Sequence, residues 1–445
     1  MPFSGGMALA LANSFLMSAK RKSMTATIEA VPASPAIVEI PRIAPDAAPT
    51  KRRADGPLSV VVIQSADDLA EWRAAWEDLA RATIESNVFY EPWMLLPALR
   101  LFGQGSRIEI VLVTAPDPLR PHGSPILCGL FPLERKRHYR SFPVTTLRLW
   151  KYIHCYLCTP LVRAGYEREC IEALFGWLDK GDSKAGLMEF NHVPGEGKFY
   201  HLLVDHLHES GKINFVSDRF LRTMFRRKGS AEIYLREALS GDTRRILKRK
   251  QRRLAELGHL RYVALDSGAE IDPWIERFLA LEASGWKGRQ GSAMGCSEAS
   301  RRFFREAVTE AFRHGRLRAL ALLLDDRPIA HQWYFVTGDG SFAFKTAFDE
   351  EFAKSSPGVL LQIEQVYRLH EDPEIEWMDS CAVSGSYLGQ LWTEGRLMQT
   401  VLIGTGKGAG EFVVSFMPLL KWIGRKLRLT ASYKFLCLLA GLKEF

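Results

Sequence analysis

The sequence predicts a mixed α/β fold that occurs twice along the chain. In the second half, hydrophobic periodicity indicates a strand, two helices, three consecutive strands, a helix, a strand, a short helix and a last strand. Three strands in a row argue against the alternating units of a doubly wound sheet, and the Gly-rich dinucleotide-binding motif is absent. The first half repeats this order more loosely, at a spacing of roughly 200 residues, far longer than a solenoid repeat. We therefore expect two copies of one fold.

Local signals delimit the elements of the second half. Asp272 can cap its first helix, with Pro273 at the first position, and Gly315 follows the end of its second helix. Turns that contain Asp-Asp-Arg-Pro and Gly-Asp-Gly separate the three consecutive strands. We expect strands over 260–265, 317–324, 329–337, 341–348, 374–378 and 397–403, and helices over 272–281, 298–314, 356–370 and 387–393.

The first half has weaker but similar signals. Residues 69–79 are expected to form one helical stripe, that is, the apolar face of a single helix, because two Trp residues recur with Leu at helical spacing. We expect strands over 58–63, 107–114, 126–133 and 187–190, and further helices over 93–101, 167–178 and 199–209. The order of these elements is that of the second half.

Length and composition are typical of a globular protein with more than one domain. The chain has 445 residues, of which 47% are hydrophobic and 25% are charged. The expected parts are a disordered Ala- and Pro-rich tail over 1–56, an α/β domain over 57–217, a basic connecting segment with a helix over 218–257, a second α/β domain over 258–405, and a basic amphipathic helical tail over 406–445.

The N-terminal tail and the cysteines indicate a cytoplasmic protein. Residues 7–17 are weakly apolar, but basic residues follow this run instead of preceding it, and the run is too short to span a bilayer. Met24 is an alternative start to Met1. The seven Cys residues lack regular spacing, which indicates reduced thiols. Cys155 and Cys158 form a Cys-x-x-Cys without a second such pair, so no metal site is predicted.

The net charge of +8 indicates an anionic partner. Residues 219–253 contain 13 Lys or Arg and 3 acidic residues, with a helix expected from Asp242 as its cap to Leu257. Its basic face either meets solvent or binds a phosphate-rich substrate or RNA. The tail after Gly404 interleaves Phe and Leu with Lys and Arg. This helix either docks on the second domain or lies on an anionic membrane, which would place the protein at its inner face.

Four short segments of the second half resemble the CelD/BcsL group of acetyltransferases. They are 284–288, 327–330, 345–349 and 355–358, with the sequences SGWKG, RPIA, KTAFD and SSPG. The resemblance covers about 58–405 and implies the GNAT (GCN5-related N-acyltransferase) fold. It also implies acetyl-CoA or another acyl-CoA as donor, and a link to cellulose and other exopolysaccharide production. The group is similar to the Fem aminoacyl transferases, which carry two GNAT-like domains in one chain.

In a GNAT fold, the loop between the third consecutive strand and the next helix holds the pyrophosphate of coenzyme A. Ser356 can cap this helix, and Pro357 suits its first position. We expect free N–H groups and the positive end of the helix dipole to bind the phosphates there. The predicted donor-binding residues are Lys354, Ser355, Ser356, Gly358, Val359 and Leu360, with free amides at the last three.

Acyl transfer to an amine also needs a base and a surface for the acceptor. Asp349 and Asp379 end the two strands that should enclose the donor, so they are the candidate bases. His331 and Lys345 lie on neighbouring strands, and either could reach the acceptor or simply complete the sheet. Trp286 and Lys287 follow a helix and could form the rim of the acceptor site.

Three functions fit these features. The first is transfer of an acyl group, expected to be acetyl, from acyl-CoA to an amine or hydroxyl of a cell-envelope or polysaccharide precursor. The second is a Fem-like transfer from aminoacyl-tRNA, which the basic segment leaves open. The third is a degenerate, non-catalytic assembly factor for exopolysaccharide synthesis. It is favoured by a departure from the family, because no Lys precedes Trp392 after the strand that ends at Asp379.

Overall fold

The structure is a computed structural model that describes residues 58–117, 125–181, 183–266, 268–382, 387–406 and 408–428. These residues form two compact units. Unit 1 contains Thr223–Glu298 and Val308–Glu394, and unit 2 contains the described residues up to Arg222, Ala299–Ala307 and those from Gly395 onward. The predicted N-terminal tail and the end of the C-terminal tail lie outside the described residues.

Unit 2 has a mixed sheet with the order β1-β2-β3-β4-β6-β13-β7. All the strand pairs from β1 to β13 are antiparallel except β4 with β6, which run parallel. Its elements are β1 (Ser59–Ile63), α2 (Ala66–Ala70), α3 (Arg73–Ala82), η1 (Val88–Tyr90), α4 (Pro92–Phe102), β2 (Arg107–Ala115), β3 (Ile126–Lys136), β4 (Thr146–Leu149), β5 (Leu161–Val162), α5 (Glu167–Asp179), β6 (Leu187–Pro194), α6 (Lys198–Glu209), β7 (Asn214–Arg226), β13 (Glu394–Gly404) and α13 (Ala409–Arg428).

Unit 1 has a sheet with the order β8-β9-β10-β11-β12, which the last residues of β7 complete. Again all pairs are antiparallel except one, β11 with β12. Its elements are α7 (Ala231–Ala238), α8 (Gly241–Ala255), β8 (Leu260–Ala264), α9 (Ile271–Ser284), α10 (Trp286–Arg289), η2 (Met294–Cys296), β9 (Leu317–Leu324), β10 (Arg327–Thr337), β11 (Gly340–Phe348), η3 (Glu350–Ser355), α12 (Pro357–Glu371), β12 (Trp377–Asp379) and η4 (Tyr387–Gln390). The helix α11 (Glu298–Arg313) is divided, with Ala299–Ala307 in unit 2 and its other residues in unit 1.

The two sheets have the same order of strands and the same single parallel pair, so the predicted fold class is confirmed. The strand that completes each sheet comes from a part of the chain that follows the elements of the other unit. β7 follows the helices of unit 2, but its residues 224–226 pair with β12 in unit 1. β13 follows the elements of unit 1, but it pairs with β6 in unit 2. Neither sheet is therefore built from one continuous stretch of sequence.

Some predicted helix starts are wrong. Ser240, not Asp242, caps α8, because its side chain accepts the N–H of Thr243 at 3.2 Å. α9 begins at Ile271, so Asp272 and Pro273 lie inside its first turn. The single stripe over 69–79 is two helices, α2 and α3.

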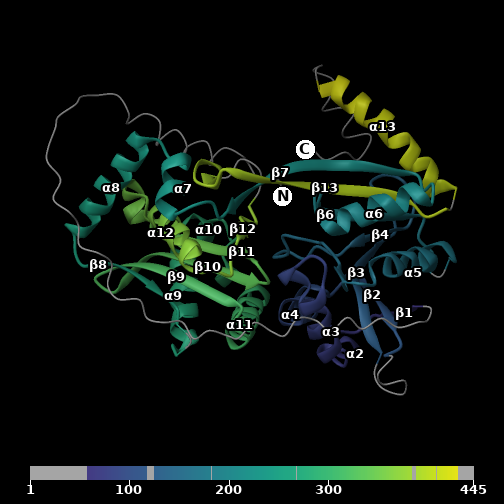
Figure 1. Cartoon of the computed structure of the whole chain (residues 1–445), viewed down its shortest axis with the longest axis horizontal. Helices are drawn as coiled ribbons and strands as arrows, with labels where there is room; N and C mark the ends of the chain where they lie inside the picture. The colour runs from purple at the N-terminus through teal and green to yellow at the C-terminus, as the bar shows by residue number, and fades with distance from the viewer. Residues whose placement is uncertain are drawn as a thin grey trace. The chain divides into compact units, whose positions relative to one another are not determined.

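In unit 1, α9 and α12 cover opposite faces of the sheet (Figure 1). The rings of His331 and Trp333 on β10 contact Phe278 of α9. The intervening Gln332 accepts a hydrogen bond at 2.6 Å from Gln362 of α12. Residues that alternate along a strand point to opposite faces. The position of a residue on β10 or β11 therefore shows which helix covers it.

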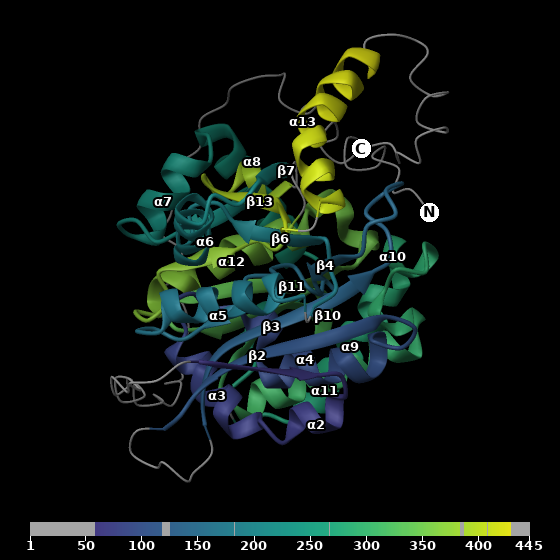
Figure 2. The ribbon, with the colours of Figure 1, turned by 90° about the vertical axis from the view of Figure 1, so that its right-hand side faces the viewer.

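The helix α13 packs on unit 2 with only part of its surface. Val413, Val414 and Met417 join a buried cluster with Leu187 and Leu402. Phe412, Leu419 and Trp422 are exposed by 62%, 45% and 56%. Figures 1 and 2 show this yellow helix projecting from the rest of its unit. Among the described helices, none combines the length and apolar character needed to cross a bilayer.

Candidate functional site

The parallel strands β11 and β12 of unit 1 diverge after a short contact. Gly340–Phe342 pair with Trp377–Asp379, and β11 then continues to Phe348 with no described strand on that side. Asp379 is fully buried at the point of divergence, where its Oδ1 accepts the N–H of Cys381 at 2.8 Å. One predicted base therefore lies where the edge of β11 becomes open.

The other predicted base, Asp349, lies at the far end of the same strand. Its Oδ1 caps η3 by accepting the N–H of Glu351 at 3.0 Å, and its Oδ2 is ion-paired with Arg327. Asp379 pairs with Phe342, so Asp349 is seven residues further along. At about 3.3 Å per residue, the two carboxylates are roughly 20 Å apart. They cannot both act on the same reacting atom.

The start of α12 differs from the predicted cap. Ser356 has a left-handed backbone with φ of 54°, and its side chain makes no capping bond. Its carbonyl accepts the N–H groups of Val359 at 3.0 Å and Leu360 at 3.1 Å. The expectation of free amides at these two residues is therefore wrong, because the first turn of the helix uses them. The amide of Gly358 remains without a hydrogen bond among the described residues.

Lys250 of the basic helix α8 supplies positive charge to this helix start. Its Nζ donates to Ser356 Oγ at 2.7 Å. Burial, with repulsion from Arg249, lowers the pKa of Lys250 below its ordinary value. The side chain of Lys354 lies exposed on η3, next to Ser355 and Ser356. One lysine bonded to Ser356, a second lysine two positions away in the sequence, the amide of the buried Gly358 and the positive end of a helix thus occur together here, which suits an anionic group.

A small recess lies beside the far part of β11. Its volume is about 40 Å³, and it is lined by Leu281, Glu282, Gly285, Trp286, Lys287, Thr346, Ala347 and Phe348. Two of the four residues predicted to bind the acceptor, Trp286 and Lys287, thus line one recess with β11.

Glu282 organises this recess, although the sequence analysis did not identify it. Its side chain is only 2% exposed. Its Oε1 accepts from Lys287 Nζ at 2.8 Å, and its Oε2 accepts the N–H of Met294 at 2.8 Å. Lys287 Nζ also donates to the carbonyl of Thr346 at 2.8 Å, which ties α10 to β11. In the sequence, Glu282 could have been noticed as a carboxylate within the apolar run of α9.

Glu350 fixes the turn before α10. Its Oε1 accepts the N–H of Trp286 at 2.7 Å, and its Oε2 accepts from Arg289 at 2.6 Å. The hydrogen bond from Arg289 lowers the pKa of the Glu350 carboxyl. Through this residue, η3 and α10 are joined at the mouth of the recess. Neither Glu350 nor Arg289 belongs to a recognisable motif, so only the structure reveals this link.

The remaining two predicted acceptor residues do not line the recess. His331 is 1% exposed, and its ring packs between Trp274, Phe278 and Trp333. Lys345 Nζ lies 5.3 Å from the ring centroid of Phe344. A bulge places Lys345 opposite Trp333, on the face that α9 covers.

Acidification should destabilise the protein partly through His331. Burial, with a smaller contribution from Arg277, lowers its pKa from 6.5 to about 3. The unfolded chain therefore binds a proton below pH 6.5 that the folded chain excludes, and stability falls as the pH drops from there toward 3. At about pH 5 this costs about 2 kcal/mol. His331→Phe should remove that loss, measured as the change in unfolding free energy between about pH 7.5 and pH 5.

The control for this prediction is His201→Phe, at an exposed position. His192 has a pKa that burial lowers to about 3, so some acid sensitivity should remain in the His331 variant. An unchanged pH dependence in His331→Phe would contradict the assignment of a neutral, buried imidazole.

Comparisons with known proteins concern the same part of the chain. Residues 241–387 match the family model of the acetyltransferase (GNAT) domain. This part of the chain is similar to GNAT acetyltransferases. No curated protein sequence matches the chain significantly.

Three solved structures are similar to this chain at low sequence identity. The crystal structure of FemX is 10% identical, with 74% of this chain and 95% of that chain covered and a TM-score of 0.47. A tandem GNAT protein from the clavulanic acid biosynthesis pathway is 14% identical, with 79% and 99% covered and a TM-score of 0.40. The C-terminal domain of a putative lysylphosphatidylglycerol synthetase from Agrobacterium fabrum is 10% identical, with 77% and 94% covered and a TM-score of 0.46.

The GNAT-like match lies outside the main part of unit 2, where the equivalent gap between strands is filled. β4 pairs with β6 only over Thr146–Arg148. The segment 150–160 then runs beside the rest of β6, where Cys158 donates its N–H to the carbonyl of His192 at 3.2 Å. Its residues Trp150, Tyr152 and Leu157 are buried. The open strand edge is thus a feature of unit 1.

Proposed function

We propose that unit 1 transfers an acyl group from an acyl-CoA thioester to an amine or hydroxyl. The observation that carries the proposal is Lys250, which reaches across from α8 to Ser356 at the start of α12. Together with Lys354 and the amide of Gly358, it would hold the pyrophosphate of coenzyme A, while Ser355, Val359 and Leu360 shape the helix start. The match of residues 241–387 to the GNAT family supports the same donor.

The donor would extend from Ser356 along the open edge of β11. In the transfer, the acyl carbon forms a bond to the acceptor nitrogen or oxygen, and its bond to sulfur breaks. An N–H group on the open edge would stabilise the oxyanion. Asp379, at the divergence of the strands, is the proposed base that receives the acceptor proton. Asp349 takes a supporting role in this proposal, because its ion pair with Arg327 stabilises η3 next to the donor site.

The acceptor would enter at the recess formed by Trp286 and Lys287. We propose a cell-envelope or polysaccharide precursor, because segments 284–288 and 355–358 resemble the CelD/BcsL group. Lys345 and His331 would support this side of the site from the α9 face, since neither lines the recess.

Thermal stability with a panel of ligands tests this function directly. Acetyl-CoA and longer acyl-CoA compounds should raise the melting temperature, since a ligand that binds only the folded state stabilises it. Stabilisation by an aminoacyl-tRNA without any effect of acyl-CoA would support the Fem-like alternative. Release of free coenzyme A thiol upon addition of a hydroxylated polysaccharide fragment would show transfer, and binding without release would support an assembly factor.

We also propose that α13 lies on an anionic membrane at its inner face. The exposed side chains of Phe412, Leu419 and Trp422 offer an apolar surface, and the sequence around them is basic. The protein should therefore sediment with vesicles of phosphatidylcholine and phosphatidylglycerol. The double variant Phe412→Ser, Trp422→Ser should bind these vesicles roughly tenfold more weakly, because most of the apolar contact is lost.

Val204→Ser is the matched control for the membrane prediction. It removes an exposed apolar side chain from α6 of the same unit, and it should leave vesicle binding unchanged. Equal binding of the double variant and the wild type would show that α13 does not contact the lipid.

A further inference from the structure

Unit 2 contains two thiols held side by side in the segment 150–160. The sulfur atoms of Cys155 and Cys158 are 4.0 Å apart. The two residues are 1% and 0% exposed. The acyl-transfer proposal uses neither of them. The sulfurs would have to approach by about 2 Å to reach the bonding distance of about 2.0 Å.

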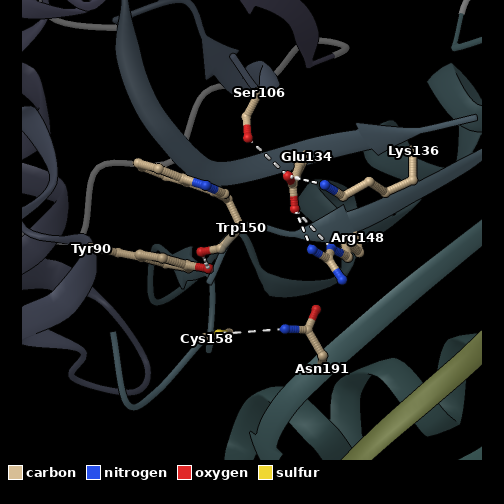
Figure 3. Close-up of polar contacts among 8 residues, drawn as sticks. All are labelled: Tyr90, Ser106, Glu134, Lys136, Arg148, Trp150, Cys158 and Asn191. Atoms are coloured by element: carbon tan, nitrogen blue, oxygen red, sulfur yellow. Dashed lines mark hydrogen bonds and ion pairs between the residues drawn. The ribbon is translucent and has the colours of Figure 1, made fainter. Parts of the chain in front are cut away.

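Side chains from other elements fix the backbone that carries these thiols. Asn87 donates from its Nδ2 to the carbonyls of Leu157 at 3.2 Å and Thr159 at 2.8 Å. Tyr90 donates from its hydroxyl to the carbonyl of Trp150 at 2.9 Å (Figure 3). The segment has no regular secondary structure, but its carbonyls are paired with buried donors. The backbone that carries the two thiols is therefore held in place.

The two thiols have different surroundings. Cys155 donates its S–H to the carbonyl of Leu157 at 3.1 Å, while Cys158 accepts from Asn191 Nδ2 at 3.7 Å (Figure 3). Burial raises the pKa of Cys155 well above its ordinary value. Burial also acts to raise the pKa of Cys158, but the neighbouring Cys155 thiol, Lys151, Tyr90 and Arg222 lower it overall. The surroundings therefore favour ionisation at Cys158 over ionisation at Cys155.

A charged cluster close to this site shows that unit 2 tolerates fixed charge in its interior. Glu134 is 4% exposed and accepts from Ser106, Lys136 and Arg148 (Figure 3). Burial alone would raise its pKa, but the bonds from Lys136 and Arg148 lower it below its ordinary value. Both carboxylate oxygens of Glu134 accept hydrogen bonds, and the sulfur of Cys158 accepts one from the Asn191 amide. The donor to Cys158 is a neutral amide at 3.7 Å, whereas Glu134 is bonded by two cations.

We propose that Cys155 and Cys158 form a reversible intramolecular disulfide when the protein meets a small peroxide. The Cys158 thiolate attacks one peroxide oxygen, the O–O bond breaks, and the released hydroxide takes a proton to become water. Cys158 is then a sulfenic acid. The sulfur of Cys155 attacks the sulfur of Cys158, the S–O bond breaks, and the leaving hydroxide takes the Cys155 proton. Two thiols and one hydrogen peroxide give one disulfide and two waters.

The other buried cysteines provide a contrast within the same unit. Burial raises the pKa of Cys128 to about 12, and it raises the pKa of Cys170 well above its ordinary value. Both therefore remain protonated thiols, which react slowly with peroxides. Oxidation should select the Cys155–Cys158 pair over these two residues.

Peptide mapping tests the proposal because trypsin separates the cysteines. Cleavage after Lys151 and Arg163 gives a peptide, 152–163, that contains Cys155 and Cys158 and no other cysteine. The folded full chain is treated with hydrogen peroxide, denatured, labelled with maleimide and digested. We expect this peptide to lose two hydrogen atoms and to resist labelling, and dithiothreitol to restore both labels. The peptide 169–180, which carries Cys170, should stay fully labelled.

Single variants separate the two roles. Cys155→Ser should stop at a sulfenic acid on Cys158, which dimedone traps, whereas Cys158→Ser should leave Cys155 unmodified. If peptide 152–163 in the wild-type chain keeps both labels while exposed Cys296 becomes oxidised, the proposal is wrong. This outcome needs no variant, so a folding defect in either variant cannot obscure it.

Discussion

Lys250→Met should weaken the binding of coenzyme A at least tenfold, equivalent to about 1.4 kcal/mol. The wild-type ammonium lies 2.7 Å from Ser356 Oγ at the start of α12, and the variant keeps an unbranched side chain, one atom shorter, without the charge. A charge-assisted hydrogen bond to a phosphate is worth about 1.5–3 kcal/mol, so losing one such bond accounts for the expected change. Calorimetric titration of both proteins with coenzyme A measures this effect.

Lys248→Met is the matched control. Lys248 is exposed on the same helix, so its removal lowers the net charge equally without touching Ser356. Its affinity for coenzyme A should stay within about twofold at moderate salt, because an exposed charge is largely screened. If the Lys248 and Lys250 variants lose the same affinity, the effect is the general charge of α8, and the donor site is elsewhere.

Glu282→Gln should lower the rate of acyl transfer about 100-fold while leaving coenzyme A affinity unchanged. The substitution keeps the shape of the side chain but removes the charge that holds Lys287 at 2.8 Å. Lys287 in turn holds α10 against the carbonyl of Thr346. A displacement of about 1 Å in a positioning group can cost this much in rate. We also expect a loss of about 1.5–3 kcal/mol in unfolding free energy, since a charged hydrogen bond is weakened.

Glu270→Gln removes a carboxylate from an exposed position at the start of the same helix and serves as the control. Its rate and stability should match those of the wild type. Steady-state kinetics with a varied acceptor and chemical denaturation measure both quantities. A Glu282→Gln variant with the wild-type rate would mean that the recess is not the acceptor site.

Local signals predicted most of the elements, because hydrophobic period and turn residues act over a few positions. Three consecutive strands and the helix after Ser356 follow from such signals, and both are confirmed. The cap at Ser356 was wrong because its left-handed backbone directs the carbonyl, instead of the side chain, to the first amides. An added Cβ at Gly358 would make only an ordinary contact with Phe348 at 3.6 Å, so packing alone does not require a glycine there.

The contacts that build the site could not be predicted from the sequence, and the reason is physical. Lys250 and Ser356 are 106 positions apart, and the link between Trp286 and Glu350 spans 64. No periodicity or short motif reports a pairing at that distance. From the sequence, His331 could either reach the acceptor or simply complete the sheet. The three aromatic rings around it show that it is buried in the core.

The strands that complete the two sheets, β7 and β13, set the order in which the chain can finish folding during synthesis. Pro194 of β6 pairs with Met398 of β13, so about 200 residues must leave the ribosome before this sheet is complete. Until then, one edge of β6 offers unpaired N–H and C=O groups to any neighbouring strand. The C-terminal half of the chain thus supplies the strand that pairs with β6 in the N-terminal half. A nascent chain arrested before residue 394 should expose that edge, which makes it a natural point of attachment for a chaperone.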